Sequence, residues 1–270
     1  MCSSTRASSA RATRLSCQAG PARCSSTPGC KATKWPASRP TCPIRARPSW
    51  PASRRIRIGI TCSGTPGSAR APRYGTARCA AAVRVQLSDA RWRARIAQWI
   101  PPDIVEQVPL DLLGLITGLP AGTARIPWDG PQVRIVEHQA HAPGHAALLI
   151  EERGVLVAGD MLSDVLIPML DLSDTADPIE DYLAALRLLE GAADDVDVLV
   201  PGHGSIGGAD QVRARIDQDR AYVHALREAG VPGDPRVGPS ATFGKGWLPG
   251  VHERQLQHLA QRRERDGTPG

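Results

Sequence analysis

The sequence predicts a mixed α/β fold for its C-terminal two-thirds, preceded by a segment with no regular fold. Three observations predict this division. The first 88 residues hold 16 of the 33 Lys and Arg and no Asp or Glu, whereas the remaining residues hold 17 basic and 27 acidic residues. All seven cysteines lie before position 80, and all seven histidines lie after position 137. From position 83 onward, short apolar runs alternate with amphipathic stretches, a pattern typical of α/β domains.

Residues 1–82 combine low hydrophobicity with charge of one sign. This composition predicts disorder, because too little apolar surface is available to offset chain entropy. Three explanations stay open: a disordered basic tail, a nucleic-acid-binding arm, or translation of a GC-rich gene in the wrong reading frame. The last is favoured, because out-of-frame GC-rich codons give Arg, Ala, Pro, Ser and Cys with an abrupt loss of acidic residues. A nucleic-acid partner is disfavoured, since Trp35, Trp50 and Tyr74 are too sparse to form a base-stacking surface.

The chain carries no signal for a membrane or for export. Its longest apolar run is far shorter than the roughly 18–20 residues that a spanning helix needs. Its first residues, Met-Cys-Ser-Ser-Thr-Arg, are not followed by the apolar stretch of a signal peptide. The seven cysteines match no common disulfide or zinc spacing. We therefore expect a cytoplasmic protein with reduced thiols and no membrane partner.

The predicted elements begin with residues 83–87, Val-Arg-Val-Gln-Leu, whose alternation predicts a half-buried strand. Ser88 is a suitable N-cap for a helix over 89–99, because Pro101 and its neighbour end any helix there. A second helix is predicted over 103–117.

A strand over 133–136 is predicted to lead into the loop 141–145. Residues 146–150 and 155–158 then read as two paired strands, joined by a turn at 151–154 that ends in Gly. These segments form the predicted centre of a sheet.

The strongest helix start in the sequence lies at Asp177-Pro178-Ile179-Glu180. Asp177 can cap the helix, Pro178 fits its first position, and Glu180 completes a capping box. The helix is predicted to run to about Glu190.

A short strand is predicted over 196–200, followed by a long amphipathic helix over 209–229 and a polar helix over 251–264. Residues 83–232 are assigned to one domain and residues 233–270 to a C-terminal extension.

Three predicted strands each end in a side chain that can bind a metal. The loop His141-Ala142-Pro143-Gly144-His145 contains Pro and Gly, which exclude a regular helix and favour a tight turn. Asp160 follows the apolar run Val155–Gly159, where a carboxylate is costly to bury unless it is paired or bound to a metal. His203 follows the apolar run 198–200 in the same way. A mixed His and Asp set suits divalent ions such as Zn²⁺.

These motifs, His-Ala-Pro-Gly-His at 141–145, Gly-Asp at 159–160 and Pro-Gly-His-Gly at 201–204, resemble in this order the later motifs of the metallo-β-lactamase superfamily. The resemblance covers about residues 83–230. It implies a metallo-β-lactamase-like αββα sandwich, incomplete here because only the second half matches. It also implies that His145 binds a first metal ion, that Asp160 bridges two ions, and that His203 binds the second.

The resemblance implies a metal-dependent hydrolase that acts on a small-molecule substrate. Asp160 stands where some β-lactamases carry Cys, which favours the branch that cleaves esters, lactones or thioesters. The expected cofactor is one or two Zn²⁺ ions, with Fe or Mn as alternatives, and Asp160 is the residue expected in catalysis. A bound divalent ion lowers the pKa of water from about 15.7 toward 7 and so supplies hydroxide at neutral pH. His141 and Asp164 are expected to support the metal ligands.

The first motif of the family, His-x-His-x-Asp-His, is absent, because no His precedes His138 and no Asp precedes Asp89. Each ion would then have two protein ligands, whereas a catalytic zinc usually has three. We therefore expect this chain to bind metal weakly and to hydrolyse little. The alternatives are a catalytically inactive homologue that acts as an interaction protein through its basic N-terminal arm, and a non-functional gene product with an exposed apolar sheet face.

Overall fold

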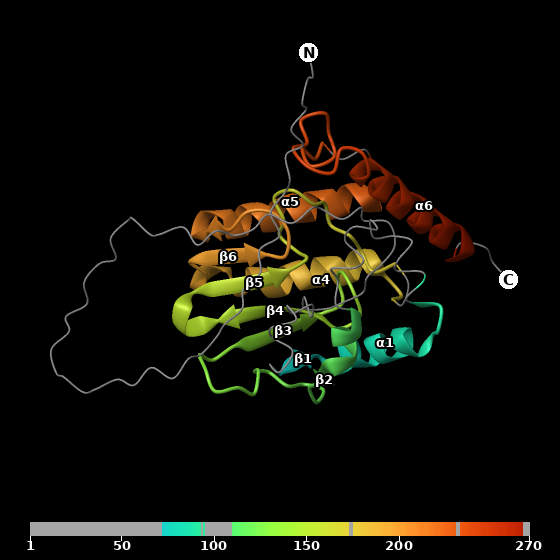
Figure 1. The fold of residues 1–270 in the computed structure, drawn as a ribbon. Coiled ribbons are helices and arrows are strands. Elements are labelled where there is room, and N and C mark those ends of the chain that lie inside the picture. The colour runs from blue at the N-terminus through green and yellow to red at the C-terminus, as the bar shows by residue number, and fades with distance from the viewer. Residues whose placement is uncertain (1–71, 93, 95–109, 173–174, 231–232, 267–270) are drawn as a thin grey trace, which may run out of the picture.

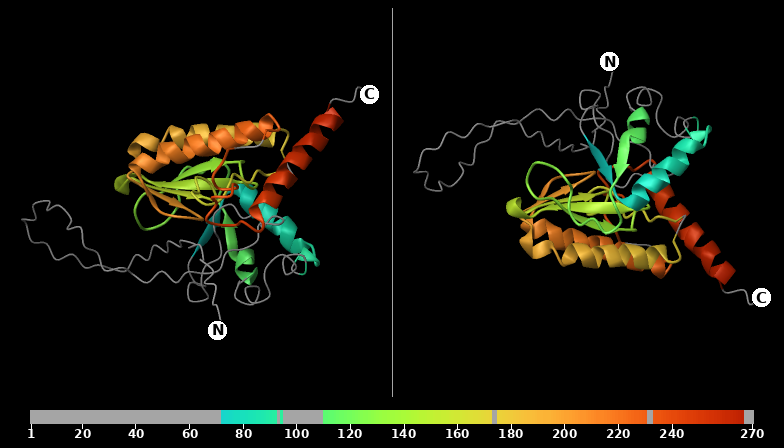
Figure 2. Two further views of the ribbon diagram at one scale, coloured as in Figure 1. Left: turned by 90° about the horizontal axis from the view of Figure 1, so that it is seen from above. Right: turned by 90° about the horizontal axis from the view of Figure 1, so that it is seen from below.

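The computed structural model describes residues 72–92, 94, 110–172, 175–230 and 233–266. Within these residues, a five-stranded sheet of order β3-β4-β5-β6-β7 carries helices α4 and α5 on one face (Figure 1). A second, two-stranded sheet, β1-β2, lies with α1 on the opposite side (Figure 2). The predicted mixed α/β class is confirmed. The helix predicted over 89–99 and the start of the helix predicted over 103–117 lie largely outside the described residues.

The described chain begins with two elements that the sequence analysis placed in the disordered segment. Strand β1 (Arg73–Gly75) pairs in parallel with β2 (Ile116–Gly118). Helix α1 (Ala77–Ser88) follows, and its N-cap Thr76 accepts a hydrogen bond from the Cys79 amide. The expectation of disorder up to residue 82 is therefore wrong for residues 72–82, whereas residues 1–71 lie outside the described part.

The strand predicted over 83–87 is also wrong, because these residues form the second half of α1. The buried residues Cys79, Ala80 and Val83 recur at a helical spacing, and Val85 is 71% exposed. Alternation over only five residues fits a strand or a helix end, and the run of three alanines before it favours the helix. Part of the second predicted helix is instead a 3-10 helix, Leu110–Leu115, that leads into β2.

The central strands of the large sheet agree with the sequence pattern. Strands β3 (Arg134–His138), β4 (His145–Ile150) and β5 (Val155–Gly159) form an antiparallel meander. The β4–β5 turn ends at Gly154, whose φ of 56° is left-handed and suits glycine. The strands predicted at 133–136, 146–150 and 155–158 are thus confirmed.

Strand β6 (Val198–Pro201) lies parallel to β5, and the two-residue β7 (Gly207–Gly208) completes the sheet. Helix α4 (Pro178–Glu190) provides the crossover between β5 and β6. Because β5 and β6 are parallel neighbours, the loops that follow them emerge at the same edge of the sheet.

The two faces of the large sheet differ in burial. One face packs on α4 and α5 (Ala209–Arg227), and the register places Leu149, Leu156 and Leu199 in one fully buried row. On the other face, the register aligns a second apolar row whose members are only partly buried except for Val200: Ile135, Leu148, Val157 and Val200.

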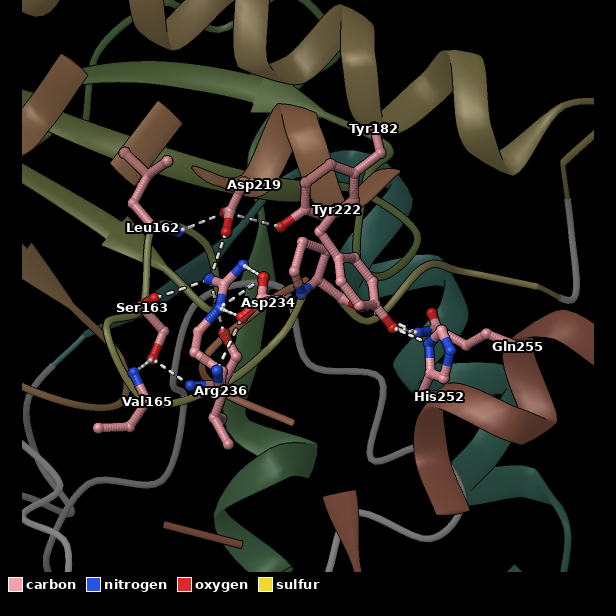
Figure 3. Close-up of polar contacts among 12 residues, drawn as sticks. Leu162, Ser163, Val165, Tyr182, Asp219, Tyr222, Asp234, Arg236, His252 and Gln255 are labelled. Atoms are coloured by element: carbon pink, nitrogen blue, oxygen red, sulfur yellow. Dashed lines mark hydrogen bonds and ion pairs between the residues drawn. The ribbon is translucent and has the colours of Figure 1, made fainter. Parts of the chain in front are cut away.

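The C-terminal helix α6 (Leu248–Asp266) is joined to α5 by polar contacts (Figure 3). Gln255 donates to the hydroxyl of Tyr222 at 3.2 Å, and this hydroxyl lies 2.9 Å from the Nδ1 atom of His252. The Gln255 carbonyl also accepts from the amide of Leu170 at 2.8 Å. Helix α6 therefore holds the loop that follows β5. None of the helices in the described ranges combines the length and the apolar character that a membrane span requires.

Candidate metal centre

The three predicted strand-end motifs converge at one edge of the large sheet. Asp160 directly follows β5, and His203 follows β6 by two residues. His141 lies in the turn before β4, and His145 is the first residue of β4. The hydroxyl of Thr76, the cap of α1, donates to the Gly144 carbonyl at 2.8 Å and holds this turn from the other side.

The carboxylate of Asp160 lies between two imidazoles. Its Oδ2 atom is 3.3 Å from Nε2 of His141, and its Oδ1 atom is 3.5 Å from Nε2 of His203. The side chains of His141, Asp160 and His203 are 15%, 30% and 42% exposed, so the cluster opens to solvent on the His203 side.

His145 contacts the backbone of Asp160 rather than its carboxylate. Its Nε2 atom is 3.2 Å from the Asp160 amide nitrogen, and its Nδ1 atom is 3.2 Å from Nε2 of His138. Because the amide can only donate, Nε2 of His145 is the acceptor in this contact. His145 therefore keeps an unprotonated Nε2 at the site.

Burial and neighbouring charges shift the pKa values of the four residues at the site in different directions. Burial disfavours a charged His141, but the hydrogen bond and the charge of Asp160 outweigh this effect and raise the pKa of His141. Burial disfavours the ionised Asp160, but the hydrogen bond to His141 and the neighbouring histidines hold the pKa of Asp160 well below its usual value. Burial and the nearby His141 lower the pKa of His138 to about 3. Burial and the nearby His138 and His141 lower the pKa of His145 as well.

Gly202 and Gly159 have no side chain, which leaves room for the side chains of Asp160 and His145. A Cβ atom at Gly202 would lie 2.4 Å from Oδ1 of Asp160. Gly159 has a φ of 60°, and a Cβ atom there would lie 2.6 Å from the ring of His145. The glycines of the Gly-Asp and Pro-Gly-His motifs therefore form turns and also let neighbouring side chains come close to the backbone.

Asp164, the other residue expected to support the metal ligands, does not reach the Asp160 carboxylate. Its Oδ1 atom accepts from the amide of Ser205 at 2.8 Å, and its Oδ2 atom is 3.8 Å from Nη2 of Arg215. Asp164 thus links the loop after β5 to the loop after β6.

Several residues around the site were not singled out from the sequence. These are His138, which contacts His145, and a buried polar network behind the Asp160 loop: Arg215, Asp219 and Arg236. The sequence does contain a signal for the first two members of the network. Arg215 and Asp219 lie one helical turn apart on the same face as Val212, Ile216 and Val223, where charged residues are unusual.

The distances between the donor atoms fit a divalent ion, but the donors are too few to complete its coordination. Two ligands on one tetrahedral zinc ion lie about 3.3–3.5 Å apart, as His141 and His203 do from the two oxygens of Asp160. Among the described residues, however, no three His, Cys, Asp or Glu side chains are grouped so that they could hold one ion. The cluster therefore fits half of a metal centre.

The chain is similar to known proteins over part of its length. A family model described as the metallo-beta-lactamase superfamily matches residues 83–203, whereas no curated protein matches the chain. A metallo-beta-lactamase family protein from Thermus thermophilus is 24% identical, with a TM-score of 0.46 over 74% of this chain and 69% of its own. A beta-lactamase domain protein from Burkholderia ambifaria is 25% identical, with a TM-score of 0.46 over 77% of this chain and 65% of its own. The chain thus spans about two thirds of the length of these proteins. Over residues 83–203 the chain is thus similar to the metallo-beta-lactamase superfamily, whose members typically bind divalent metals.

Proposed function

We propose that this chain carries the second half of a divalent metal centre from a hydrolase that cleaves a small ester, lactone or thioester. The observation that carries the proposal is the Asp160 carboxylate between the imidazoles of His141 and His203 at the ends of adjacent parallel strands. The family-model match over residues 83–203 supports the same assignment.

In this proposal each side chain has a separate task. Asp160 presents one oxygen toward each imidazole and would bridge two ions. His203, the most exposed of the three, faces solvent, from which substrate would enter. The Nδ1 atom of His141 lies 2.9 Å from the Met169 carbonyl, which can only accept, so neutral His141 keeps its proton on Nδ1 and a free lone pair on Nε2. A bound ion would supply hydroxide at neutral pH by acidifying water.

The donor count favours low activity in the chain as it stands. Each oxygen of Asp160 has one imidazole partner, and a catalytic zinc usually has three protein ligands. The same observation supports the alternative of a catalytically inactive homologue.

The reading frame of the upstream coding region distinguishes the two functions. Thr76 and Cys79 pack against the Gly144 turn, so we infer that any change of frame lies upstream of Arg73. The experiment is to read the gene before codon 73 in all three frames and to express any chain that gains His-x-His-x-Asp-His.

A hydrolase origin predicts that the corrected chain holds close to two Zn, Fe or Mn ions by elemental analysis. It should also cleave a p-nitrophenyl ester, a lactone or an acyl-glutathione thioester, and Asp160→Asn should abolish that activity. Absence of the motif in every frame, together with a metal-free protein, would favour the inactive homologue.

A further inference from the structure

Arg215 of α5 joins the two loops that carry the site. Its Nη1 atom donates to the carbonyl of Leu162 at 3.2 Å and to the carbonyl of Ser205 at 2.9 Å. Leu162 follows Asp160 by two residues, and Ser205 follows His203 by two residues. One guanidinium group therefore contacts equivalent positions in both loops.

Leu162 is held in an unfavourable backbone conformation by the same helix. Its φ is 56°, which is uncommon for a residue with a bulky side chain. Its amide donates to Oδ2 of Asp219 at 3.1 Å, and its carbonyl accepts from Arg215. Because Asp219 lies one turn after Arg215, two neighbouring side chains of α5 bind both polar groups of this residue. Such strain persists where the surroundings impose it, and it fixes how the chain leaves Asp160.

Arg236 also supports the loop that follows β5 (Figure 3). Its Nη1 atom lies 2.6 Å from Oδ1 of Asp219, and its Nε and Nη2 atoms donate to Oδ1 and Oδ2 of Asp234. It also donates to the carbonyls of Ser163 and Leu166 at 2.9 and 3.0 Å. The loop after β5 is thus bound by buried charged groups along its length.

Stability alone is a poor explanation for Arg215. Its side chain is 5% exposed, and the nearest carboxylate oxygen, on Asp164, lies 3.8 Å away. Its Nε atom is buried without a hydrogen-bond partner among the residues that the structure describes. A buried cation with incomplete pairing contributes little to stability, and an apolar residue of similar volume often serves as well or better. The contacts of Arg215 with the two loops account for a charged side chain at this position.

We propose that Arg215 is a positioning residue that sets the separation between the Asp160 carboxylate and the His203 imidazole. Asp164 assists it, because it binds the amide of Ser205 while Arg215 binds the carbonyl of the same residue. The consequence for ion binding rests on the proposed function, whereas the consequence for geometry does not.

The test compares Arg215→Met with Arg213→Met. Arg213 lies on the same helix, is exposed and pairs only with Asp194 among the described residues, so its variant controls for the loss of a charge on α5. Crystal structures of both variants give the distance from Asp160 Oδ1 to His203 Nε2, which is 3.5 Å in the parent chain. We expect Arg215→Met to lengthen it by about 1 Å or more, the scale at which sites lose function, and Arg213→Met to leave it unchanged.

Zn²⁺ affinity, measured by competition with a chromophoric chelator, gives the second readout. Loss of a residue that supports metal ligands typically weakens binding by about 10–100-fold, and we expect this range for Arg215→Met only. A parent chain that binds no Zn²⁺ would refute the proposed function, and the crystallographic distance would still decide the role of Arg215. An unchanged distance in Arg215→Met would overturn the positioning role.

A second pair of variants decides the matter if Arg215→Met does not fold. Asp164 is partly exposed, so Asp164→Ala removes the acceptor for the Ser205 amide at little cost to the core. We expect Asp164→Ala to lengthen the same distance, and Asp164→Asn, which keeps an acceptor, to restore it. Equal distances in the alanine and asparagine variants would overturn the proposal.

Discussion

At the residue scale, the pair formed by His141 and Asp160 makes stability depend on pH. The pKa of His141 is raised from 6.5, so its stabilising effect is complete below that value and is lost as pH rises through the folded-state pKa. The pKa of Asp160 is lowered from 3.8, so its effect is complete above that value and is lost as pH falls. The pair therefore stabilises the fold most between these two values.

The variant His141→Gln should lose this stabilisation. Its free energy of unfolding, measured with urea, should fall below that of the parent by more at pH 5.5 than at pH 9, since only the lower pH keeps both partners charged. In an Asp160→Asn background the same substitution should show no such difference. An equal loss at both pH values in the parent background would show that the pair is not ionised.

A single methyl group added at Gly202 should disturb the site around Asp160. Gly202→Ala would place a methyl group 2.4 Å from Oδ1 of Asp160 and 3.0 Å from the Gly159 carbonyl oxygen. Because overpacking of this kind typically costs 1–3 kcal/mol, we expect the free energy of unfolding to fall by about that amount. Gly246→Ala is the control, since no atom lies within 4 Å of its added methyl group. Equal stability of the two variants would mean that the β6 loop adjusts freely around Asp160.

At the element scale, α4 depends on a single N-terminal cap. Asp177 accepts from the amides of Ile179 and Glu180, both at 3.0 Å. Asp177→Ala should lower the free energy of unfolding by about 1 kcal/mol, whereas Asp177→Ser should retain most of it. Urea unfolding measures both, and equal losses in the two variants would exclude the side-chain cap as the cause. The rest of the expected capping box is replaced, because the Glu180 carboxylate binds Arg187 and Arg227.

The elements that the sequence predicted correctly are those with strong local signals. The cap at Asp177 and the apolar runs of β4, β5 and β6 specify their own structure. The prediction of a strand over 83–87 was wrong. Its alternation is short, and the burial of Cys79 and Ala80 against the rest of the fold favours a helix. A strand pattern read over five residues leaves out the helical spacing of Cys79, Ala80 and Val83 just before it.

The same distinction holds for the site. Asp160 and His203 could be found from the sequence, because each follows an apolar strand that brings it to the sheet edge. Their supporting residues could not be assigned, since the partners of Arg215 and Arg236 lie tens of residues away in the chain. His138 shows the same limit, because its role depends on the ring of His145 across the β3–β4 pair.

At the scale of the whole molecule, the two faces of the large sheet are covered unequally within the described part of the chain. One face of the large sheet is buried under α4 and α5, whereas Ile135, Leu148 and Val157 on the other face stay partly exposed. Around Asp160, likewise, each carboxylate oxygen has one imidazole partner, which is fewer donors than one ion usually takes. Both features agree with a sequence that contains the later motifs of the resemblance but not His-x-His-x-Asp-His.

The affinity of the purified chain for Zn²⁺, with Asp160→Asn beside it, tests this half-centre most directly. Two donors per ion predict weak binding that disappears in Asp160→Asn, because both imidazoles lose their shared carboxylate. Two tightly bound ions per chain, or binding that Asp160→Asn leaves unchanged, would contradict an Asp160-centred half-site.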